Sequence, residues 1–324
     1  MTKILAWSVV FIAAIWTIEA PDFEPIVAFV ASLLTAITLQ VKKSNDKQET
    51  EASPTIEESD NTFEVAEEEK TPEVNPVFKL AERFLEVFES HGVHLNEIPR
   101  CIPEKFGISL VELANKDKLI EKLTPDLIDW FCSIFNIRRD WLEANGNYIY
   151  DTKNYYKNEH SLLRLLKDLK EQHHSSMRVI AYKDVKELDS GGERPQDVNL
   201  LIVIPAFKID DRLVMKYIPT STQWDWGYWR SRYQFKGITR VCYKKLDLTF
   251  DGYNLDSEKM AELSSGGVFP KLIIDETPMG YTWYPDDYTD KETESRCAKE
   301  THENRSILDY IDEQRYADVF TDNA

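Results

Sequence analysis

Two long apolar stretches open the chain. Residues 4–18 read ILAWSVVFIAAIWTI and residues 25–41 read PIVAFVASLLTAITLQV, and neither contains a charged side chain. A helix on the surface of a globular domain shows a polar face, which both stretches lack. The acidic turn EAPDFEP between them carries two prolines. The pattern therefore predicts a membrane hairpin of two transmembrane helices over residues 1–43.

The charges around this hairpin predict its orientation. Lys3, Lys42 and Lys43 flank the outer ends, whereas the turn carries only acids. By the positive-inside rule both termini face the cytoplasm, which predicts a multi-pass protein of the inner (cytoplasmic) membrane. Two alternatives stay open. A cleaved signal peptide has a poor cleavage site before Pro21 and is followed at once by a second apolar stretch. A buried helical hairpin of a soluble domain would show polar positions.

Residues 44–75 change the pattern to an acidic segment rich in Glu, Ser and Thr. Almost no large apolar side chain interrupts it. Such a segment buries too little surface to offset its ordering entropy, so a disordered linker is expected.

Residues 76–150 show the period of amphipathic helices. Apolar residues recur every three or four positions from Val77 to Phe88, and Gly92 is expected to end that helix. Ser109 and Glu112 form a capping-box pattern, and Thr124-Pro125 predicts a further helix start. Several short helices with small connections predict an all-α bundle.

Two segments of this bundle carry a resemblance. GVHLNEI at residues 92–98 and LTPDLIDWFCSIFNIRRDWL at residues 123–142 resemble parts of the phage-repressor (lambda repressor and Cro-like) helix-turn-helix domain, over about residues 84–146. The resemblance implies a DNA-reading helix from Ser109 to about Leu123. The side chains that it would present to bases or phosphates are Asn115, Lys116, Lys118 and Lys122.

The module departs from that family in three respects. Pro99 falls inside the second helix, and PEKFG at residues 103–107 lengthens the turn. Residues 76–150 carry 12 acidic against 9 basic side chains, whereas a DNA-binding domain shows a basic face. A helix-turn-helix scaffold used for protein interaction or dimerisation is therefore the alternative.

Residues 155–276 change to β-branched and aromatic runs separated by Gly, Pro, Asp and Asn. Strands are expected over residues 177–183, 198–209, 211–218, 227–235, 238–246, 246–253 and 268–275, with a hairpin turn at Asp210-Asp211. Helices are expected over residues 159–174 and 256–265. The pattern predicts an antiparallel α+β domain with a sensory or assembly role. Residues 285–324 form an acidic tail with one short amphipathic helix.

The stretch QWDWGYWRSRYQF at residues 223–235 is unusually aromatic. One interpretation is a ligand-binding lip, where rings stack on a planar molecule and arginines hold an anion. The favoured alternative is packing of amphipathic aromatics within the sheet. The candidate ligand-binding residues are Trp224, Trp226, Trp229, Arg230 and Arg232.

Charge, cysteine content and catalytic motifs limit the activities that the sequence predicts. The formal charge of the 324 residues is −18, which argues against a broad electrostatic grip on phosphates. Four scattered cysteines fit buried thiols in a reducing compartment. His91 and His94 are expected to be surface or capping residues rather than metal ligands. The sequence has no G-x-S-x-G, H-E-x-x-H, Walker A or G-x-G-x-x-G motif, so neither an enzyme nor a metal or cofactor is expected.

These features together predict a bacterial, membrane-tethered cytoplasmic regulatory protein. Its helix-turn-helix module would contact DNA and its α+β domain would sense an unidentified ligand or assemble a homo-oligomer. The alternative is a two-span membrane effector, of a defence or toxin type, gated by the cytosolic body. A structural scaffold is the third reading.

Overall fold

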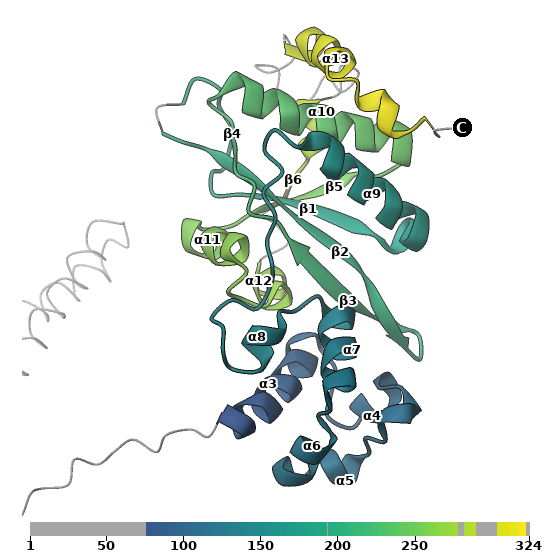
Figure 1. Ribbon diagram of the computed structural model, residues 1–324. Helices are drawn as coiled ribbons and strands as arrows, with labels where there is room; N and C mark the ends of the chain where they lie inside the picture. The colour runs from purple at the N-terminus through teal and green to yellow at the C-terminus, as the bar shows by residue number, and fades with distance from the viewer. Residues whose placement is uncertain (1–75, 193, 278–281, 290–302, 322–324) are drawn as a thin grey trace, which may run out of the picture. The chain divides into compact units, whose positions relative to one another are not determined.

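The computed structural model describes residues 76–192, 194–277, 282–289 and 303–321 (Figure 1). All of them belong to one compact unit, Thr71–Ala324. The two apolar stretches of residues 1–43 and the acidic linker 44–75 lie outside the described residues.

The predicted membrane architecture requires correction. Across the described residues, no helix combines the length with the apolar composition needed to cross a lipid bilayer. This finding contradicts the fold class with a transmembrane hairpin and the multi-pass location that was inferred from it. The described fold is a mixed α/β sheet with helices.

The helical module comprises short helices whose starts follow local capping signals. The Ser109–Glu112 capping box and the Thr124 cap are confirmed, and Gly92 ends the first helix with a φ of 74°. The Ser109 and Thr124 side chains accept from backbone N–H groups that the first helical turn leaves unpaired. The elements are α3 (Pro76–Ser90), α4 (Ile98–Cys101), η1 (Glu104–Phe106), α5 (Leu110–Leu113), α6 (Lys116–Lys122), α7 (Pro125–Phe135) and α8 (Arg139–Leu142).

The sheet is mixed, not antiparallel as expected. Its order is β3-β2-β1-β5-β6, with β4 paired to β2. β5 runs parallel to β1 because the intervening helix α10 (Trp229–Leu246) crosses one face and returns the chain in the same direction. The hairpin turn at Asp210-Asp211 is confirmed. The strands are β1 (Arg178–Lys183), β2 (Asp197–Ile209), β3 (Arg212–Pro219), β4 (Trp224–Asp225), β5 (Phe250–Asn254) and β6 (Thr282–Trp283).

Three predicted strands are helical. Residues 229–246, divided between two expected strands, form α10, and residues 270–275 of a third lie in α12 (Pro270–Glu276). In α10 the buried positions include Phe235, Ile238 and Cys242, which follow helical spacing toward the sheet. The other elements are α9 (Glu159–His173), η2 (His174–Ser176), α11 (Ser257–Ser265), η3 (Pro285–Tyr288), α13 (Asn304–Glu313) and η5 (Tyr316–Val319).

The two faces of the sheet support two cores. Val179 and Ala181 of β1 pack with α9, α10 and the C-terminal turn η5. Ile180 and Tyr182 belong to the opposite core, which includes α11, α12 and the helical module (Figure 1). Phe135 of α7 meets Phe207 of β2 with ring centroids 5.7 Å apart. The bundle and the sheet therefore share one continuous core.

Candidate functional site

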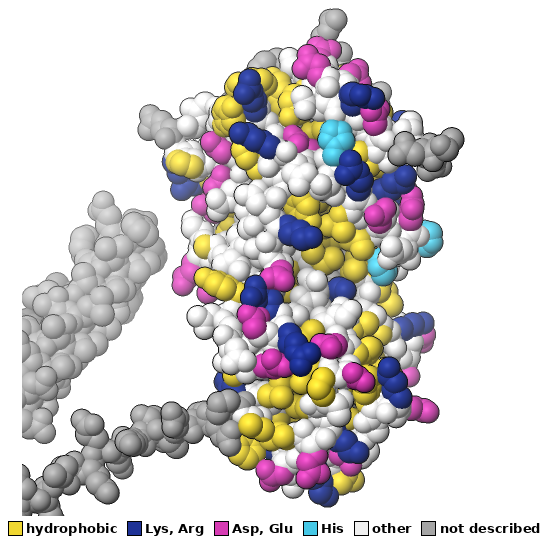
Figure 2. All heavy atoms as spheres, viewed as in Figure 1, with side chains coloured by type: hydrophobic (Ala, Val, Ile, Leu, Met, Phe, Trp, Pro, Cys, Tyr) yellow, Lys and Arg dark blue, Asp and Glu magenta, His cyan; other side chains and the backbone are white. Residues whose placement is uncertain are grey.

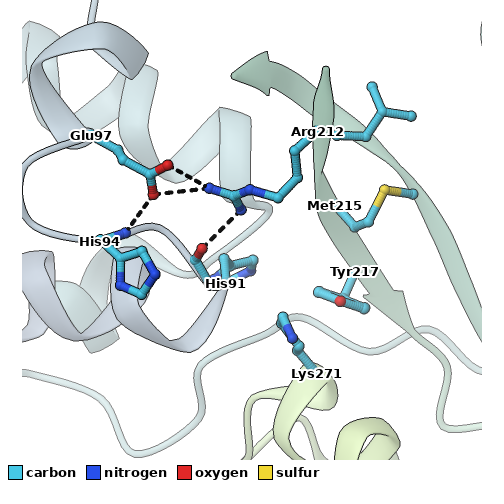
Figure 3. Close-up of a pocket in the computed structure, with 9 residues that line it drawn as sticks. His91, His94, Glu97, Arg212, Met215, Tyr217 and Lys271 are labelled. Carbon is cyan, nitrogen blue, oxygen red and sulfur yellow. Dashed lines mark hydrogen bonds and ion pairs between the residues drawn. The ribbon is translucent and has the colours of Figure 1, made fainter. Parts of the chain in front are cut away.

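A pocket of about 430 Å³ lies where the helical module meets the sheet. Figure 3 shows its walls: the segment after α3, strand β3, and the start of α12. Small-molecule sites commonly have volumes in this range. The lining residues are His91, Gly92, His94, Glu97, Arg212, Leu213, Met215, Tyr217 and Lys271.

Arg212 joins the two sides of this pocket. Its Nη2 donates to both carboxylate oxygens of Glu97, each at 2.9 Å, and its Nη1 donates to the Gly92 carbonyl at 2.8 Å. Glu97 also accepts from the His94 backbone N–H at 2.8 Å. The His94 amide and the Arg212 guanidinium lower the pKa of Glu97, so that the carboxylate is charged. We call this set of contacts the Arg212 clasp.

A second ion pair lies near the clasp, at the tip of the β2–β3 hairpin. Arg100 of α4 lies 2.9 Å from a carboxylate oxygen of Asp210, the left-handed turn residue before β3. Both side chains are largely exposed, so this pair contributes little to stability. The pair nevertheless connects α4 of the helical module to the β2–β3 hairpin at a second point beside the pocket.

His91 brings a neutral polar ring into the apolar junction. The residue is only 3% exposed, and its ring lies 4.6 Å from that of Phe135 and 5.6 Å from that of Tyr217. Burial lowers the pKa of His91 to about 4. Nδ1 lies 2.6 Å from the Val87 carbonyl, which accepts only, so Nδ1 carries the proton. Nε2 is then a buried acceptor without a partner among the described residues, which is energetically costly.

The expected surface position was wrong for His91, which is buried, although its Nδ1 does contact a carbonyl of the last turn of α3; His94 is exposed. The sequence signal that was missed is the helical spacing that His91 continues at the end of α3. His91 follows buried Phe84 by seven positions and Val87 by four, which continues the buried stripe of the helix.

The predicted DNA-reading helix is not continuous. α5 ends at Leu113 and α6 begins at Lys116. The Asn115 side chain caps α6 by accepting from the N–H groups of Asp117 and Lys118 at 3.0 and 3.2 Å. Lys116 lies 2.8 Å from Glu82 of α3. Both residues therefore have structural partners within the bundle.

Lys118 and Lys122 remain on the outside of α6, exposed and half-buried respectively. Figure 2 shows acidic and basic side chains interspersed on the viewed face of the molecule. DNA binding by these residues stays a prediction.

The predicted ligand-binding lip is divided by the fold. Trp224 and Trp226 are fully buried, where no ligand reaches them. Arg232 is buried, and its Nη2 lies 2.5 Å from the Glu303 carboxylate. Lys236 Nζ lies 2.8 Å from the same carboxylate. Trp229 and Arg230 lie outside, with the guanidinium 5.1 Å from the Trp229 ring centroid. Only this last pair could take part in a surface ligand site.

Metal and thiol chemistry find little support in the part of the chain that the structure describes. It contains no group of three His, Cys, Asp or Glu side chains placed to hold a metal ion. Burial raises the pKa of Cys101 to about 11 and that of Cys132 to about 12, so both remain thiols near neutral pH.

Comparisons with protein-family models, with curated proteins and with solved structures found no match. Among the described residues, the candidate site is the junction pocket.

Proposed function

We propose that this chain is a ligand-responsive regulatory protein. The sheet and the helical module would bind a small molecule between them, and the module would pass the response to a partner. The observation that carries the proposal is the Arg212 clasp across the pocket, from β3 to the segment after α3. A ligand in this pocket touches side chains from both sides of the junction.

Binding at such a junction has a direct route to regulation. A ligand shifts a conformational equilibrium only through different interactions with the two states. Here it would compete with, or add to, the bonds that hold Glu97 and Gly92 on Arg212.

The test is whether small molecules bind this pocket and alter the clasp. The full chain would be screened by thermal shift against carboxylates, phosphates, polyols and amines. Hydrogen exchange would then be measured across residues 91–101. We expect a binding compound to change exchange in that segment more than in the rest of the described chain.

A matched pair of variants locates the binding. Leu213 lines the pocket and is 41% exposed, whereas Leu272 lies outside the lining and is 46% exposed. Leu213→Trp should block binding and Leu272→Trp should not. Absence of binding by every compound, or equal binding by both variants, would contradict the proposal.

The binding partner of the helical module is a separate part of the proposal. Duplex DNA remains its predicted partner, on the resemblance and on exposed Lys118 and half-buried Lys122.

A further inference from the structure

We propose that the junction pocket binds a small anion, held above Gly92 by Arg212 and Lys271. This inference rests on the proposed function, because it names the chemical class of the regulatory ligand. The shared chemistry is a compact carboxylate or phosphate group.

The two cations converge on one point of the backbone. A side-chain Cβ placed at Gly92 would lie 4.0 Å from Arg212 Nη1 and 3.9 Å from Lys271 Nζ. The two nitrogens are thus within about 8 Å of each other, close enough for one carboxylate or phosphate to contact both. Figure 3 shows Arg212 coming from β3 and Lys271 from α12 on either side of this segment.

Glycine at position 92 lets the Lys271 side chain pack closely on the backbone. Gly92 has a φ of 74°, in the left-handed region that favours glycine. The Lys271 Cε would lie 3.1 Å from the same Cβ position. A side chain at position 92 would therefore press on the Lys271 stem and displace its ammonium group.

Two cations face the pocket and each is already paired with a carboxylate, so a bound anion would exchange with the Asp275 carboxylate on Lys271. Arg212 and Lys271 contribute two positive charges and Glu97 one negative charge, and His91 is neutral at pH 7. Asp275 pairs with Lys271 from outside the lining. These acids hold the cations in position before a ligand arrives. Such preorganisation reduces the cost of ordering side chains on binding.

The test uses inorganic phosphate and succinate as probes of the full chain. Each is titrated at constant ionic strength against sodium chloride, and binding is followed by calorimetry. Lys271→Met keeps the aliphatic stem over Gly92 and removes the charge. The matched control is Lys259→Met: Lys259 has 32% side-chain exposure against 30% for Lys271, and it also pairs with a carboxylate, that of Glu276.

We expect at least one probe to bind, and Lys271→Met to weaken it about tenfold, as the loss of one charge-assisted bond implies. Lys259→Met should bind like the wild type. Phosphate binding without succinate binding would assign a phosphate ligand, and the reverse a carboxylate. Failure of both probes, or equal affinities for the two variants, would overturn the anion assignment.

The outcomes separate this inference from the proposed function. If a neutral compound binds in a manner blocked by Leu213→Trp while both anions fail, the anion assignment is wrong and the regulatory role stands. If an anion binds through Lys271 but exchange at residues 91–101 does not change, the anion site stands and the regulatory role is wrong.

Discussion

The buried His91 ring predicts a specific dependence of stability on pH. Its pKa is lowered from 6.5 to about 4 by burial, so the folded protein binds this proton more weakly than the unfolded chain. Unfolding then takes up a proton between pH 6.5 and pH 4. The free energy of unfolding must therefore fall as the pH falls through this window, and the full contribution is present above it.

The magnitude follows from the size of the shift. One pKa unit corresponds to about 1.4 kcal/mol, so acidification from pH 7 to pH 4.5 should cost about 2.5 kcal/mol at this residue. His91 is 3% exposed, so solvent screening offers little reduction.

His91→Phe isolates this contribution because it keeps the aromatic contacts and removes the titrating group. At pH 7 the variant should lie within about 1 kcal/mol of the wild type, since it loses the bond to Val87 and also the unpaired Nε2. Urea unfolding at pH 7, 6, 5 and 4.5 gives the free energy of unfolding of both proteins. Groups that titrate in both proteins cancel when one free energy is subtracted from the other. Parallel curves over this range would refute the assignment of a buried, neutral His91.

Three further predictions concern other parts of the fold. Glu303→Gln removes a buried carboxylate whose pKa is lowered to about 2 and should lower the free energy of unfolding by about 3 kcal/mol in urea at pH 7. An unchanged midpoint would contradict the buried ion pairs of Glu303 with Arg232 and Lys236. Trp226→Ala should cost about 3–5 kcal/mol and Trp229→Ala less than about 0.5 kcal/mol, because only the former is fully buried; equal losses would show that the burial is misassigned. If the helical module binds duplex DNA, fluorescence anisotropy of the full chain should detect it at low salt, and replacing Lys118 and Lys122 by Gln should reduce the salt slope by about 2; no binding at low salt would end the DNA hypothesis.

The full chain is the appropriate material for the DNA assay. Phe135 of the bundle packs on Phe207 of the sheet, and both belong to the same core. A fragment of residues 76–150 would expose that apolar surface to water. Loss of binding by such a fragment would therefore say little about the intact protein.

Local signals in the sequence predicted the starts and ends of several elements. Thr124 caps α7, Ser109 and Glu112 form the capping box of α5, and Gly92 ends α3. Each signal acts within about four residues along the chain, so no tertiary information is required to detect it.

The same local reasoning failed for residues 227–246. Aromatic and β-branched side chains favour strands on average, and these residues were predicted as strands on that ground. The chain instead leaves β4 after two residues and forms α10. Burial of Phe235 and Ile238 against the sheet outweighs the weak local preference.

The sequence by itself determined the helical character of residues 76–142, the β2–β3 hairpin, and the chemistry available at each position. Only the tertiary structure decided that β5 runs parallel to β1, that the bundle and the sheet share a core, and that Gly92, Arg212 and Lys271 meet at one pocket. The physical reason is distance along the chain. Caps and turns are local interactions, whereas these three residues are separated by 120 and 59 positions and come together only when both cores are packed.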